Sequence, residues 1–216
     1  INQAISRVLG YDMVMNIALG ISATRPFSNS ISGPMGIKNY WRHATYSAAV
    51  CQAICSLFPS SKRPQAGTAY LCGLLHNFGF LLLGHLFPKE LIRLNKSIVE
   101  NPLATVRTLE QKLIQTDHTD IGSQLMKSWS MPKEIVITLA HHHNFEYDGE
   151  HSIYVKLVQL ADILLKGHGL GDADFNEIPA PLLQQLNLRE EQLYVIFEKT
   201  IQARNNLDIM AGQMAA

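Results

Sequence analysis

Polar residues interrupt the apolar helical stripes of this chain at positions that should face a core. His43 shares a stripe with Val50 and Ile54, and Asp162 stands among the apolar residues of the segment 155–165. A buried imidazole or carboxylate is costly unless it is hydrogen-bonded, paired with a charge or bound to a metal. Each of these positions therefore predicts a partner inside the fold.

Apolar residues recur at the three- and four-residue spacing of helices, and no alternating strand pattern is sustained. This spacing predicts an all-α fold with helices over 4–19, 40–58, 66–86, 89–99, 103–115, 118–129, 132–143, 155–165 and 189–206. Glycine and proline predict loops at 25–38 and 167–171. We expect the small-residue tail to Ala216 to fray.

A chain of 216 residues lies within the size range of one domain. We predict a single domain over 1–216, with an N-terminal helical segment and loop over 1–38, a core over 39–170 and C-terminal helices over 171–216. The sequence starts at Ile1 with helical spacing already under way. This start suggests a piece of a longer protein, and N-terminal processing or disorder would give the same start.

The charge balance argues against polyanionic partners. The 18 basic residues equal the 18 acidic ones, and Lys62, Arg63 and Lys133 form no large patch. We therefore expect neither nucleic acid nor a membrane as a partner. No apolar run reaches the roughly 18 residues that span a bilayer, and the N-terminus lacks the pattern of a signal peptide. These features predict a soluble, cytoplasmic protein.

Two local motifs have ordinary explanations. Cys51, Cys55 and Cys72 have no zinc-finger spacing and suit buried thiols in a reducing compartment. A nucleophilic pair of Cys72 and His76 is conceivable, but apolar surroundings would raise the thiol pKa. The glycines of 167–171 resemble a dinucleotide loop, yet they follow a helix and not a strand.

Several of the nine histidines recur in a series that spreads over five predicted helices. The series consists of His43, His76, Asn77, His118, His142, His143 and Asp162. These residues can meet only if the helices pack around one pocket. Imidazoles and a carboxylate suit iron, manganese or zinc. A hydrogen-bonded polar network that joins the helices is the other reading, and the sequence leaves both open.

The remaining candidates have smaller roles. We expect Glu110 to order its helix or to form hydrogen bonds across the pocket, without a catalytic role. His85, His151 and His168 stand near loops or helix ends. For these three histidines we expect exposure to solvent.

Six blocks in order carry a family resemblance. They are Trp41-Arg42-His43, the segment Gly73-Leu74-Leu75-His76-Asn77-Phe78-Gly79, Glu110 followed eight residues later by His118, Trp129-Ser130-Met131-Pro132, His142-His143 and Ala161-Asp162. With these blocks the chain resembles the HDOD family from about Ala4 to beyond Asp162. That family is the signalling relative of the HD-domain metal-dependent phosphohydrolases, which include the HD-GYP cyclic-di-GMP phosphodiesterases. The resemblance implies an HD-domain-like helical bundle around a His/Asp pocket, with an HD-like core over 39–170.

The chain departs from the catalytic relatives at three places. Asn77 stands where the name-giving aspartate follows the histidine, and a neutral amide brings no charge to a dinuclear centre. Phe80 stands where the catalytic relatives carry lysine. The Gly-Tyr-Pro signature is replaced by Asn144-Phe145-Glu146-Tyr147.

The resemblance implies a bacterial, cytoplasmic signal-transduction module that acts through contacts with other signalling proteins or domains, with a homodimer as an open alternative. On this interpretation the pocket is degenerate and no residue is catalytic. Its metal ligands would be His43, His76, Asn77, His118, His142, His143 and Asp162, with iron, manganese or zinc as the metal. The alternative is a metal-dependent phosphohydrolase, a phosphodiesterase acting on a nucleotide or cyclic dinucleotide. Two metals within about 4 Å would favour the enzyme.

Overall fold

The computed structural model describes residues 31–172, 175 and 177–215, so the helix predicted over 4–19 and residues 25–30 lie outside the described part. The described chain contains no strand, which confirms the all-α class. Its elements are α3 (Ile37–Ile54), the 3-10 helix η2 (Cys55–Leu57), α4 (Ala66–Leu75), α5 (Phe78–Leu86), α6 (Pro88–Glu100), α7 (Val106–Ile114), α8 (His118–Ser128), α9 (Lys133–His141), α10 (Ser152–Lys166), α11 (Ala180–Leu186), α12 (Glu190–Gln202) and α13 (Arg204–Met214).

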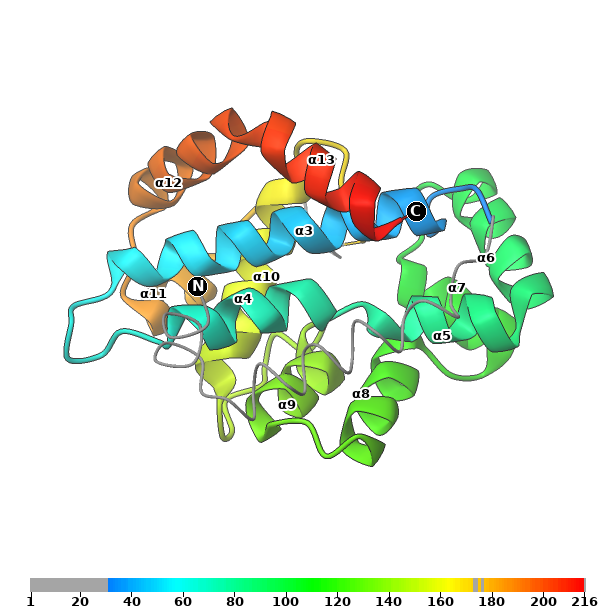
Figure 1. Ribbon diagram of the computed structural model, residues 1–216. Helices are drawn as coiled ribbons and strands as arrows, with labels where there is room; N and C mark the ends of the chain where they lie inside the picture. Colours follow the sequence, from blue (N-terminus) through cyan, green and yellow to red (C-terminus); the bar gives the residue numbers. More distant parts are fainter. Residues whose placement is uncertain (1–30, 173–174, 176, 216) are drawn as a thin grey trace.

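Helix α3 runs through the centre of the bundle. It contacts α4 and α10 as well as α12 and α13, and Figure 1 shows α13 and α4 on opposite sides of it. Its buried residues Ala44, Ala48 and Cys51 repeat every three or four positions, which places them on one face. Small side chains on this face allow the neighbouring helices to approach closely.

Helix α10 forms the core of the molecule. Every residue from Tyr154 to Leu165 is buried, and the helix contacts α3, α4 and α9. A helix that is buried all round has no solvent face to present. Asp162 therefore lies in the interior, as its place on an apolar stripe predicts.

The apolar stretch 66–86, expected as one helix, forms two helices separated by His76 and Asn77. Taken as one stretch, Ala66–Leu86 is long and apolar enough to cross a membrane by length and composition, which corrects the expectation that no such run exists. In the structure 78% of that window is buried inside the protein. Such burial is typical of a core helix pair, and it leaves two polar residues at the break.

Helices α5 and α8 pack so closely that only glycine fits at Gly79. A Cβ atom there would overlap the backbone carbonyl of His118. This contact brings the start of α8 against the start of α5. It therefore places His118 next to the break that holds His76 and Asn77.

The C-terminal segment differs from the expectation. The helix predicted over 189–206 ends at Gln202, and the tail expected to fray forms α13. Leu207 and Ala211 lie four residues apart, are buried and belong to a helix that packs on α3. Asp208 stands between them in sequence and accepts hydrogen bonds from Arg42 and Tyr46 at 2.9 and 3.0 Å. These contacts with α3, absent from the local sequence pattern, order the tail.

Candidate metal centre

The predicted histidines and aspartate converge in one pocket at the centre of the bundle. Their residues are between 0% and 8% exposed, and they are His43, His76, Asn77, His118, His142, His143 and Asp162. The predicted convergence is confirmed, because the Nε2 atom of His76 lies 3.4 Å from Oδ1 of Asp162. Their role as metal ligands stays a prediction.

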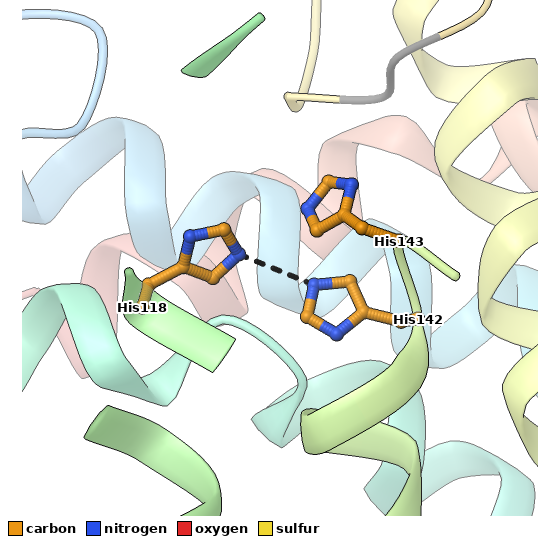
Figure 2. A group of neighbouring side chains, drawn as sticks. All are labelled: His118, His142 and His143. Carbon is orange, nitrogen blue, oxygen red and sulfur yellow. Dashed lines mark hydrogen bonds between the residues drawn. The ribbon is translucent and has the colours of Figure 1, made fainter. Parts of the chain in front are cut away.

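One group of ligand atoms comes from three histidines. Figure 2 shows the rings of His118, His142 and His143 turned toward one another, from the start of α8 and the end of α9. The Nε2 atoms of His118 and His142 are 3.3 Å apart. One nitrogen from each of the three rings falls within 4.8 Å of the others, so the group could hold a metal ion.

A second group lies beside the first. Asp162 Oδ1 is 3.1 Å from Nε2 of His43 and 3.4 Å from Nε2 of His76, and Ser47 donates to it at 3.4 Å. Asp172, from the segment after α10, completes this group. The four ligand atoms of His43, His76, Asp162 and Asp172 also lie within 4.8 Å of one another.

Local structure fixes the position of His118. Asp117 caps α8 by accepting hydrogen bonds from the backbone amides of Thr119 and Asp120, which makes His118 the first residue of the helix. Glu110 on α7 accepts from the backbone amide of His118 at 2.9 Å and from its Nδ1 at 2.7 Å. Glu110 therefore orients the ring, as the sequence predicts, and its own carboxylate is fully buried.

Backbone carbonyls orient two further rings. His76 is the C-cap of α4, and its Nδ1 donates to the carbonyl of Gly73 at 2.8 Å. His142 is the C-cap of α9, and its Nδ1 donates to the carbonyl of Leu139 at 3.0 Å. Each ring is therefore held by the turn of helix that precedes it.

These bonds determine which ring nitrogens face the pocket with a lone pair. A carboxylate or carbonyl oxygen can only accept, so the neutral rings of His76, His118 and His142 carry their proton on Nδ1. Their Nε2 atoms then present lone pairs to one another and to the aspartate oxygens. A pocket lined by electron donors is stabilised by a cation, and metal-binding histidines typically donate their other nitrogen to such an acceptor.

Burial sets the protonation of most of these rings. Desolvation lowers the pKa of His76 and His142, and for His142 the neighbouring His143, His76 and His118 lower it further. Burial also lowers the pKa of His43, but the hydrogen bond and charge of Asp162 outweigh it and raise the pKa above its ordinary value. The rings of His76 and His142 are thus neutral near neutral pH, and His43 pairs with a carboxylate.

The spacing of the donor atoms fits a bound ion. Metal bonds of about 2.0–2.2 Å place adjacent ligand atoms roughly 3–3.5 Å apart. Distances of 3.1, 3.3 and 3.4 Å between donors in the two groups agree with that range. In addition, Nε2 of His76 and Oδ1 of Asn77 are buried and have no hydrogen-bond partner among the described residues. Such orphaned atoms are rare unless a ligand or ion satisfies them.

Two of the three departures from the HD-GYP pattern, at Asn77 and Phe80, border the same pocket. The ring of Phe80 is 1% exposed and stacks on His118, with centroids 4.2 Å apart and planes at 20°. A cavity of about 160 Å³ lies above His43, Asn77 and Phe80 and is bounded by Gly169 to Gly171. Access to the pocket is therefore narrow on this side.

The other candidates take ordinary places. His85 and His168 are exposed as expected, and His151 is partly exposed. Burial raises the pKa of the Cys72 thiol to about 12, and the Cys72 sulfur lies near Glu134 and Thr138. These contacts favour an inert buried thiol over a nucleophile paired with His76.

Sequence reasoning missed Asp172. Its side chain is fully buried, contacts His118 and His143 of the first group and itself belongs to the second group. Yet it stands in a loop where no helical stripe marks it. The usable signal was the glycine pattern before it. Gly169 and Gly171 have φ angles of +71° and +92°, which lets the chain turn back toward the pocket.

Comparison with known proteins gives one family match. A family model described as the HDOD domain matches residues 1–145. An uncharacterised protein of Treponema pallidum (strain Nichols) is 26% identical over 136 residues, which are 62% of this chain and 26% of that protein.

Three solved structures share the fold. A candidate signal transduction protein from Marinobacter aquaeolei VT8 is 32% identical, with a TM-score of 0.86 over 99% of this chain and 47% of that one. An HDOD domain protein of unknown function from Geobacter sulfurreducens is 19% identical, with a TM-score of 0.65 over 87% of this chain and 66% of that one. A candidate phosphohydrolase from Shewanella amazonensis SB2B is 18% identical, with a TM-score of 0.65 over 100% of this chain and 77% of that one. This chain spans less than half of the Marinobacter and Treponema proteins.

Proposed function

This chain belongs to the HDOD domain family, and from that premise we propose that it is a bacterial, cytoplasmic signalling module whose pocket holds a metal ion without hydrolysing a substrate. The metal would be iron, manganese or zinc, bound by the histidines and aspartate of the pocket. The output would be a contact with another protein or domain.

The closure of the pocket is the observation that carries this proposal. The histidine and aspartate residues are at most 8% exposed, and the cavity above them measures about 160 Å³. Pockets that bind small molecules usually measure roughly 300–1,000 Å³. Among the described residues, the cavity beside the ligand atoms is too small for a nucleotide or cyclic dinucleotide.

The two substituted positions support the same conclusion. Asn77 is neutral, and its amide nitrogen is turned toward Asp172 and His43. Phe80 covers His118 with an aromatic ring, where a lysine could meet a phosphate. The guanidinium of Arg42, which also lines this entrance, is already paired with Asp208 at 2.9 Å.

A bound ion would join the helices of the core. It would supply a positive charge to donor atoms from α3, α4, α8, α9 and α10, which otherwise face one another. Because such a site forms only in the folded chain, its binding energy adds to folding stability. We propose a structural role for the metal on this ground.

Exposed apolar side chains support an output through protein contact. Leu86, Phe87 and Ile92 are between 54% and 55% exposed. The first two border an apolar groove of about 430 Å³ between α5, α6, α7 and α8. Because the related Marinobacter and Treponema proteins are longer than this chain, another domain of the same protein is our favoured partner.

The experiment is a hydrolysis assay on purified protein with manganese or iron supplied. We expect no turnover of phosphodiesters, cyclic dinucleotides included. The matched control is His76→Ala, which removes a pocket ligand. Metal-dependent turnover that disappears in this variant would show that the protein is a phosphohydrolase.

That second candidate rests on one observation, the presence of two neighbouring groups of ligand atoms. Two groups suit two ions, as metal-dependent phosphohydrolases require. The metal-to-protein ratio separates the candidates. A ratio of one favours the module, and a ratio of two together with turnover favours the enzyme.

A further inference from the structure

The loop after α10 is built to lie against the pocket. Gly171 has a φ angle of +92°, and a Cβ atom on it would fall 2.6 Å from Nε2 of His43. Leu170 beside it is 8% exposed. A side chain at position 171 would push this loop away, so glycine allows the backbone to approach the His43 ring and to carry the next residue inward.

That next residue, Asp172, contacts both ligand groups. Its Oδ2 lies 3.2 Å from Nε2 of His143 and 3.5 Å from Nε2 of His118. Its Oδ1 accepts a hydrogen bond from the Asn77 amide at 2.8 Å. One of its oxygens also belongs to the second group, with His43, His76 and Asp162.

We infer that Asp172 is a metal ligand that replaces the carboxylate lost at Asn77 and joins the two groups into one site. This inference rests on the proposal that the pocket holds a metal. With Asp172 the two groups of ligand atoms contain two carboxylates, the number that Asp162 and an aspartate at position 77 would provide.

The pair Asn77 and Asp172 is complementary as it stands. An amide donates to the carboxylate, whereas an aspartate at position 77 would set two unprotonated oxygens at the 2.8 Å that now separates the amide from Asp172. An amide at position 77 and a carboxylate at position 172 are therefore complementary. Exchanging the two residues should preserve both the hydrogen bond and the charge.

The test compares three variants with the parent. Asp172→Asn removes the charge at nearly constant shape. The exchange variant Asn77→Asp/Asp172→Asn returns a carboxylate to position 77. Asp120→Asn is the matched control, because it removes an exposed carboxylate from the start of α8.

The measurements are manganese affinity by calorimetry and the rise in melting temperature when manganese is added. We expect Asp172→Asn to weaken manganese binding at least about tenfold. Even the mutation of a residue that only supports a metal ligand typically lowers metal affinity about 10- to 100-fold. The exchange variant should recover the parent's affinity, and Asp120→Asn should keep it. If Asp172→Asn alone fails to fold, the exchange variant still tests the inference.

Manganese binding by Asp172→Asn at the parent's affinity would overturn the inference, and so would an exchange variant that folds without recovering the affinity. A parent that binds no manganese, iron or zinc would also overturn it and would remove the metal from the proposed function, leaving a signalling module without metal. Turnover by the parent would overturn the non-catalytic module alone. The two failures are therefore distinguishable.

Discussion

The rings of His76, His118 and His142 each use Nδ1 to donate to a carbonyl or carboxylate oxygen. In the neutral state, their Nε2 atoms therefore have no proton to donate within the pocket. His118 and His142 bring two such nitrogens to 3.3 Å, and His76 brings a third toward Asp162. Protons or a metal ion can relieve this crowding of lone pairs. Burial disfavours protonation of these rings, because the protonated ring is charged.

The first residue-scale prediction is that acid destabilises the metal-free protein. Burial lowers the pKa of His76 and His142 below that of an unfolded histidine, about 6.5. The unfolded chain therefore binds more protons below that pH, and stability falls as pH falls. The raised pKa of His43 acts oppositely, but its contribution is already complete below about pH 6.5.

We expect each of the two rings to lower the free energy of unfolding by about 1 kcal/mol between pH 6.5 and 5.5. Urea denaturation midpoints in the presence of a chelator measure it. His142→Gln should show a shallower pH dependence than the parent, because one titrating ring is gone. A parent whose stability is flat over this range would contradict the prediction.

The sequence predicted seven pocket residues because each stands on or beside a helix with a readable apolar stripe. His43 and Asp162 interrupt such stripes, and the paired histidines end one. Asp172 has no stripe, since its position depends on two glycine turns and on contacts with distant helices. The Asp172 side chain points into the pocket because of tertiary contacts alone, which the local sequence does not indicate.

At the scale of elements, the contact between α5 and α8 sets the position of His118. We predict that Gly79→Ala destabilises the protein by about 1–3 kcal/mol or more, because the new methyl group meets the rigid His118 carbonyl. The matched control is Gly212→Ala on α13, where a Cβ atom would meet nothing within 4 Å. For Gly212→Ala we expect the free energy of unfolding to rise by up to about 1 kcal/mol, because alanine has the higher helix propensity.

Urea or thermal unfolding measures both variants. Equal stabilities for Gly79→Ala and Gly212→Ala would show that α5 and α8 can separate at no cost. Manganese affinity should also fall in Gly79→Ala, since His118 moves with the helix start.

The sequence predicts a helix wherever the apolar repeat is regular. It predicts the residues at which helices begin and end less well. The break at His76 and Asn77 was hidden in a continuous apolar stretch, because both flanking helices are core helices with little polar contrast. The C-terminal helix α13 was missed for the opposite reason. Only two of its residues, Leu207 and Ala211, are buried, and the helix packs on α3, which its own sequence does not indicate.

At the scale of the whole molecule, the family match ends before the pocket does. Residues 1–145 exclude α10 and the loop after it, and thereby Asp162 and Asp172. We predict that a fragment of residues 1–145 neither unfolds cooperatively nor binds manganese, because the buried residues Tyr154–Leu165 are missing from its core.

A fragment of residues 1–203 is the control. It lacks only α13 and the residues after it, so it should melt at a lower temperature and remain cooperative. Circular dichroism melts and metal content measure both fragments. A cooperative transition in the fragment 1–145 would show that α10 is not required for the core.

The pocket is assembled from residues that lie far apart in the sequence. His43 meets Asp162 across 119 residues and Asn77 meets Asp172 across 95. Contacts this far apart form late and slow folding, since a long loop must close first. A nascent chain therefore exposes five pocket histidines before Asp162 and Asp172 have been synthesised. Metal loading should therefore follow the emergence of Asp172 from the ribosome.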